Sequence, residues 1–91
     1  MLWAIDPATN RVSLEVPLAD VAEILALDVD GQEAWIALRR PGRIGMVIRV
    51  EIPGGRLLGE APVALPAAVE LSADRAWVTN YDGDEVLGFA R

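Results

Sequence analysis

The 91-residue sequence contains neither cysteine nor histidine. The lack of cysteine excludes disulfide bonds and thiolate metal sites. The lack of histidine removes the commonest metal ligand, the usual general base of enzymes and the side chain that titrates near physiological pH. We therefore expect no metal site, no cofactor and no catalytic residue within this chain.

Lysine is also missing: all eight basic residues are arginines, against 14 acidic residues and a formal net charge of −6. Affinity for nucleic acids and for anionic lipid surfaces needs clustered positive charge, so we expect neither partner. No apolar stretch approaches the ~20 residues of a membrane span. The first residues lack the basic and apolar regions of a signal peptide. The sequence therefore predicts a soluble chain and leaves its compartment open.

Hydrophobic residues make up 53% of the chain and occur in short runs separated by turn-forming residues. One run alternates strictly, with Val12, Leu14 and Val16 on a single face. The dipeptide Asp30-Gly31 is a strong hairpin signal between two runs. Such runs at a spacing of roughly ten residues indicate an all-β chain. The nine predicted strands are residues 1–6, 11–18, 23–29, 33–38, 45–52, 56–63, 67–72, 75–80 and 85–90.

The sequence also repeats itself. Residues 34–37 (AWIA) recur 42 positions later as residues 76–79 (AWVT). Residues 11–18 (RVSLEVPL) recur 45 positions later as residues 56–63 (RLLGEAPV). A third matching set is residues 2–5, 47–50 and 86–89. A period of about 42 residues with four strands is typical of a β-propeller blade. The alternative is an ordinary antiparallel meander with accidental self-similarity.

Proline and tryptophan positions agree with this repeat. Proline cannot donate to a sheet ladder and belongs on edge strands. Pro17 and Pro62 share one repeat position, in the strand expected to be outermost in its blade. Trp35 and Trp77 share another position, and we expect both to pack between blades because their large apolar area favours burial. Paired tryptophans that stack on a sugar or a peptide are the alternative.

The repeat makes the chain a single propeller segment, residues 1–91. Residues 23–29 are a nearly continuous apolar run, which predicts an innermost strand covered by neighbouring blades. The expected divisions are residues 1–18 as the outer half of one blade, 23–63 as a full blade and 67–91 as the first three strands of the next.

Three segments resemble the repeats of YVTN/NHL-type β-propellers. Residues 76–80 (AWVTN) resemble the YVTN motif, and residues 5–12 (IDPATNRV) and 27–31 (LDVDG) resemble the turns of the same repeats. The first repeat departs from the motif, with WIAL at residues 35–38. The resemblance implies antiparallel four-stranded blades that close a ring of about four to eight. Two blades' worth of sequence is then an incomplete ring.

Two loops carry the candidate ligand-binding residues. An arginine cluster can receive a carboxylate or phosphate, although such loops are more often simply solvated. The loop residues are Arg39, Arg40 and Arg43 in the first repeat, and Asn80, Tyr81, Asp82 and Asp84 in the second. Asp28 and Asp30 have the spacing of the start of a calcium loop, but the later ligands are missing, so a hairpin turn is preferred.

These features predict a non-catalytic binding or interaction scaffold. Its expected partners are the remaining blades of a longer propeller or further copies of the same chain, with a protein or small molecule bound at the loops. The alternative is part of a propeller enzyme, resembling streptogramin lyases or sugar-lactone hydrolases, whose catalytic residues lie elsewhere. The absence of histidine counts against that alternative.

Overall fold

The computed structural model describes residues 2–6, 11–16, 21, 23–42, 44–52 and 54–91, and it confirms that the chain is all-β. These ranges contain strands and turns but no helix, and so none that could cross a membrane. The strands are β1 (Leu2–Asp6), β2 (Arg11–Val16), β3 (Glu23–Asp30), β4 (Glu33–Arg40), β5 (Ile44–Glu51), β6 (Leu57–Pro62), β7 (Pro66–Leu71), β8 (Arg75–Asn80) and β9 (Glu85–Ala90).

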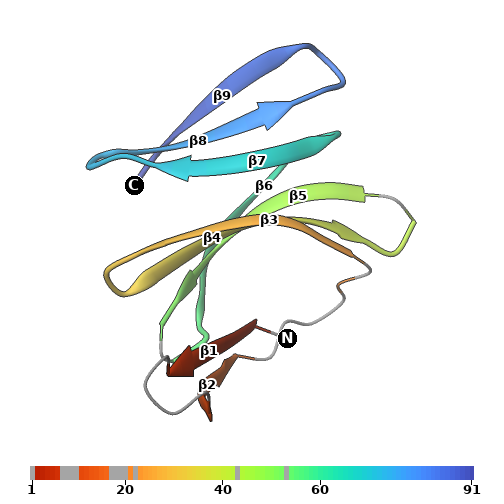
Figure 1. Ribbon diagram of the computed structural model, residues 1–91. Coiled ribbons are helices and arrows are strands. Elements are labelled where there is room, and N and C mark those ends of the chain that lie inside the picture. The colour runs from red at the N-terminus through yellow and green to blue at the C-terminus, as the bar shows by residue number, and fades with distance from the viewer. Residues whose placement is uncertain (1, 7–10, 17–20, 22, 43, 53) are drawn as a thin grey trace.

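The strands form three antiparallel sheets in which neighbours in sequence are neighbours in space. β1 and β2 form a two-stranded sheet, β3-β4-β5-β6 a four-stranded sheet and β7-β8-β9 a three-stranded sheet. Figure 1 shows the four-stranded sheet between the other two. Within each sheet the short turns favour this order because a hairpin connection brings consecutive strands side by side. The connection from β6 to β7 instead leads into the next sheet.

The β3–β4 hairpin shows how the sequence sets the local structure. Gly31 and Gln32 form the loop, between the paired residues Asp30 and Glu33. Gly31 has a φ of 63°, which residues with a side chain seldom adopt. The hairpin predicted from Asp30-Gly31 is therefore confirmed.

The four-stranded sheet contributes to two apolar clusters, one on each face. Alternate residues of a strand point to opposite faces, so β4 supplies both clusters. On the side of the two-stranded sheet the buried residues are Ala34, Ile36, Leu38, Ile48 and Val50. Between the four-stranded and three-stranded sheets they are Trp35, Val47, Val63, Ala76 and Val78. The second cluster joins two consecutive sheets, because Trp35 and Val47 come from the four-stranded sheet while Ala76 and Val78 come from the three-stranded sheet.

The prediction of a fully covered innermost strand needs correction. β3 leaves Ile24, Leu27 and Val29 between 38% and 46% exposed, whereas Ala34 to Leu38 of β4 are buried. The reason is position in the sheet, because β3 lies at one edge while β4 has a strand on each side. β6 forms the other edge and contains Pro62, as expected for a proline on an edge strand.

Candidate functional site

Asn80, predicted to contact a ligand, is a buried structural residue. Its side-chain oxygen accepts hydrogen bonds from the backbone N–H groups of Leu65 (3.0 Å) and Asp82 (3.3 Å). Its amide nitrogen donates to the carboxylate of Glu85 (3.0 Å). Asn80 therefore fixes the β8–β9 turn to the β6–β7 connection, and both polar atoms of its side chain are hydrogen-bonded within the chain.

The other predicted residues of this turn are exposed. Tyr81 is 74% exposed, and its backbone N–H donates to the carbonyl of Leu65. Asp84 has a positive φ of 51°, and Asp82 lies between them in the turn. A shallow hollow of about 160 Å³ brings together Thr79, Asn80, Tyr81, Asp84, Glu85 and Val86. Three of the four predicted residues line it, and Asp82 does not.

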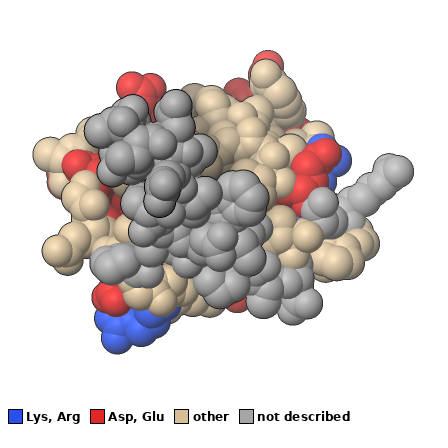
Figure 2. Space-filling model, turned by 60° about the horizontal axis from the view of Figure 1, so that its bottom comes forward, with Lys and Arg blue, Asp and Glu red and all other residues tan. Residues whose placement is uncertain are grey.

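The two described arginines of the first loop point in different directions. Arg39 lies 3.6 Å from the carboxylate of Glu23 on β3, while Arg40 pairs with Glu60 on β6 at 3.2 Å. On the face in Figure 2, the arginine atoms occur in small groups beside acidic atoms rather than in a broad basic patch. Arg39 and Arg40 therefore do not converge on one anion. Arg43, the third predicted residue, lies outside the described residues.

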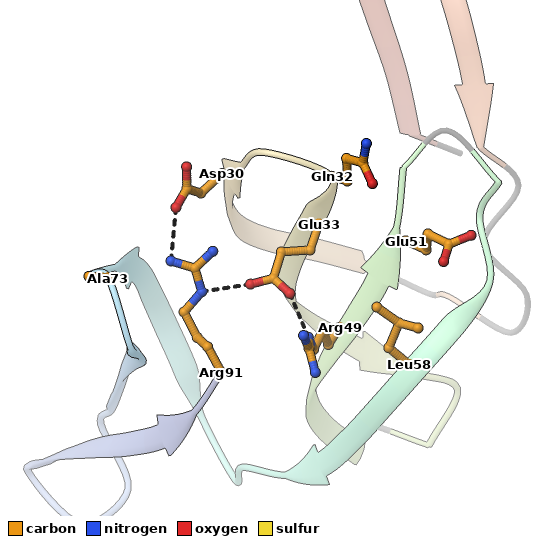
Figure 3. Close-up of a pocket in the computed structure, with 8 residues that line it drawn as sticks. All are labelled: Asp30, Gln32, Glu33, Arg49, Glu51, Leu58, Ala73 and Arg91. Carbon is orange, nitrogen blue, oxygen red and sulfur yellow. Dashed lines mark hydrogen bonds and ion pairs between the residues drawn. The ribbon is translucent and has the colours of Figure 1, made fainter.

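An ion-pair network that the sequence did not suggest lies at the opposite end of the strands. Glu33, at the start of β4, is buried and accepts hydrogen bonds from Arg49 Nε (2.7 Å) and Arg91 Nε (2.6 Å). The indole N–H of Trp35 also donates to it (3.3 Å). Figure 3 shows the two arginines converging on this carboxylate from different sheets.

Arg91, the last residue, extends the network across the sheet interface. Its guanidinium also pairs with Asp30 at 2.9 Å and donates to the carbonyl of Ser72. Its backbone N–H donates to the carbonyl of Asp74 (3.0 Å). The end of β9 is thus tied to the β3–β4 hairpin and to the β7–β8 turn. An open hollow of about 390 Å³ lies here, lined by Asp30, Gln32, Glu33, Arg49, Glu51, Leu58, Ala73 and Arg91 (Figure 3).

The electrostatics of this network favour the charged forms of Glu33 and Arg91. Burial alone would raise the pKa of Glu33, but hydrogen bonds from Arg91, Arg49 and Trp35 outweigh it and leave the pKa below its ordinary value. Hydrogen bonds to Glu33 and Asp30 raise the pKa of Arg91. A carboxylate held ionised between two arginines is poorly suited to proton transfer near neutral pH. The contacts of this network join the four-stranded sheet to the end of β9.

Asp28, considered above as the start of a calcium loop, instead links the two sheets. Its Oδ2 accepts a hydrogen bond from the backbone N–H of Leu71 on β7 (2.8 Å), and Oδ1 accepts from that of Val29 (2.9 Å). Within the described ranges, no three acidic side chains are grouped so that they could hold a metal ion.

The apolar side of the interface centres on Trp35. Its ring lies 6.3 Å from that of Phe89 on β9, tilted by 37°. The guanidinium of Arg49, its opposite neighbour on β5, lies 5.9 Å from the ring centre. The three-stranded sheet covers this side, so Trp35 is only 6% exposed and its predicted packing between sheets is confirmed.

Trp77 occupies on the three-stranded sheet the position that Trp35 occupies on the four-stranded sheet, and it lies on the outward face. Trp77 lies opposite Gly88 on β9, as Trp35 lies opposite Arg49. A Cβ on Gly88 would approach the Trp77 ring to 2.9 Å, so the ring packs closely against that glycine. Trp77 is nevertheless 43% exposed and Val86 beside it is 62% exposed, which differs from the expected packing between blades. The described sheets place no further sheet over this face.

Comparison of the chain with protein-family models, with curated proteins and with solved structures gave no match.

Proposed function

We propose that the chain is a segment of a β-propeller, built from YVTN/NHL-like repeats, that acts as a non-catalytic interaction scaffold. It completes a ring with further sheets, supplied by copies of itself or by other blades. The sequential order of the four-stranded sheet and its stacking against the next sheet support this proposal. So does the absence of histidine and cysteine from the sequence.

One observation carries the proposal: Trp77 presents, on an uncovered face, the side chain that Trp35 presents to a neighbouring sheet. The surrounding residues repeat as well, since Val86 occupies the position of buried Val47. Exposed contiguous apolar area on a small chain marks an interaction surface. The outward face of the three-stranded sheet is therefore the binding surface of the scaffold.

The proposal is tested by comparing the variants Trp77→Arg and Tyr81→Arg. Both replace an exposed aromatic residue by arginine, but Tyr81 lies in the turn and outside the outward face of the sheet. Gel filtration with light scattering should show association of the wild type and of Tyr81→Arg, and its loss in Trp77→Arg. If the wild type is monomeric, binding of an apolar-surface dye that Trp77→Arg reduces and Tyr81→Arg retains still supports an open binding face. A monomer that binds no dye, or equal behaviour of the two variants, contradicts the proposal.

A further inference from the structure

Among the described strands, the three-stranded sheet has one strand fewer than its neighbour, and no described strand pairs with the outer edge of β9. β9 is the third strand of its sheet, as β5 is of the four-stranded sheet. β5 pairs with β4 on one side and β6 on the other, whereas β9 pairs only with β8 among the described strands. The outer edge of β9 therefore offers its backbone N–H and C=O groups to another strand.

A groove runs beside this edge. It encloses about 200 Å³ between β9 and strands β4, β5 and β6 of the four-stranded sheet. Its floor is apolar where Trp35, Val47 and Phe89 meet, and its outer wall is β6. The lining residues are Trp35, Val47, Arg49, Leu58, Gly59, Glu60, Ala61, Phe89 and Ala90. A fourth strand beside β9 would cover this groove as β6 covers the edge of β5.

The two outer edges differ in a way that favours pairing at β9. The β6 edge contains Pro62, an irregular register near Leu57 and the ion pair of Glu60 with Arg40, all features that discourage a further strand. β9 has the sequence EVLGFA, with no proline and no charge after Glu85. Its pairing with β8 is regular along its whole length. An apolar edge of this kind is a template for strand addition.

We propose that this edge binds β2 from a second copy of the chain, a step that rests on the self-association considered above. β2 lies in residues 11–18, which repeat as residues 56–63. The later segment contains β6, the strand that pairs with the third strand of the four-stranded sheet. β1 pairs with β2. The sequence of β1 (residues 2–5) matches residues 47–50 of β5 and residues 86–89 of β9, so β1 and β9 are equivalent strands of the repeat. β9 can therefore replace β1 as the neighbour of β2.

The repeat also fixes the register of the exchanged pair. Leu2 corresponds to Val86 and lies opposite Val16, while Ala4 corresponds to Gly88 and lies opposite Leu14. Val86 should then lie opposite Val16 of the second copy. One copy contributes the edge of β9 and the other contributes β2, so the contact joins two different surfaces head-to-tail. Each copy in such a pair still has one unused β9 edge or one unused β2 for a further copy. Repetition of the contact builds a ring or a chain of copies.

Engineered cysteines test this register without background, since the natural chain has no thiol. The variants Val86→Cys and Val16→Cys are purified separately, mixed and oxidised. The matched control replaces Val16→Cys by Glu15→Cys, the adjacent register position of β2, because successive positions of a strand alternate between its two faces. The predicted pair should give a covalent dimer in about ten-fold higher yield than the control, because pairing holds the two thiols at high effective concentration.

The outcomes separate this proposal from the proposed function. A yield of covalent dimer from Val86→Cys alone equal to that of the mixed pair would show no preference of β9 for Val16, and equal yields with both partners would show no fixed register; either overturns the β2 site. In these cases the scaffold proposal survives. A monomeric wild type that binds no apolar-surface dye contradicts both the β2 site and the scaffold proposal.

Discussion

Trp35 and Trp77 occupy equivalent positions on consecutive sheets, but the first is 6% exposed and the second 43%. Each lies on the second strand of its sheet, opposite a residue of the third strand. The difference in exposure follows from the sheet that covers Trp35 and from the lack of a described sheet over Trp77. Trp35 packs between two consecutive sheets, and Trp77 marks the equivalent face that no described sheet covers.

The two tryptophans should respond differently to truncation. Trp35→Ala removes a ring buried against Phe89, Val47 and Ala76, and should lower the free energy of unfolding by about 3–5 kcal/mol. Trp77→Ala should cost about 1 kcal/mol or less under conditions where the chain is monomeric, since its ring is half exposed. Denaturant unfolding measured at low protein concentration gives both values. Similar losses in the two variants would contradict the assigned packing.

Gly45 and Gly59 provide a second matched pair. A Cβ on Gly45 would lie 2.9 Å from the carbonyl carbon of Ala64 and closer still to the carbonyl oxygens of Val63 and Ala64, all backbone atoms. Gly45→Ala should therefore destabilise the chain by about 2–4 kcal/mol. A Cβ on Gly59 meets nothing within 4 Å, so Gly59→Ala should change stability by less than about 0.5 kcal/mol. Thermal unfolding of both variants tests the close approach of β5 to the β6–β7 connection.

Glu33 should make stability depend on acid pH. Its pKa is lowered in the folded chain, so its contribution is present above the ordinary carboxyl value of about 4.3 and is lost as the pH falls through the lower folded value. Glu33→Gln should cost about 1–3 kcal/mol at pH 7, because Arg49 and Arg91 lose an ionised acceptor. The difference in unfolding free energy between wild type and variant should shrink toward pH 3. A difference that stays constant from pH 7 to pH 3 would contradict the network.

Asn80 should behave as a structural residue. Asn80→Ala leaves the backbone N–H groups of Leu65 and Asp82 without their side-chain acceptor and should cost about 1–3 kcal/mol. Tyr81→Ala, in the exposed part of the same turn, should change stability by less than about 0.5 kcal/mol. Equal stability of the two variants would mean that the turn does not depend on Asn80.

The sequence predicts the features of this fold that depend on neighbouring residues. The Asp30-Gly31 hairpin and the strand positions follow from local turn chemistry and short apolar runs. The contacts of Arg91 could not be predicted, because they join residues 58 and 61 positions apart. The structural role of Asn80 was also missed, since its partner Leu65 lies 15 residues away. The exposure of Trp77 depends on how many sheets stack, which the repeat alone does not determine.

The most direct test of the account is the mass of the wild-type chain in solution over a range of concentrations, measured by light scattering after gel filtration. Association through the uncovered faces and edges should give a discrete multiple of the 9.8 kDa chain. A particle of 9.8 kDa at every concentration, with cooperative unfolding and no uptake of an apolar-surface dye, would contradict it.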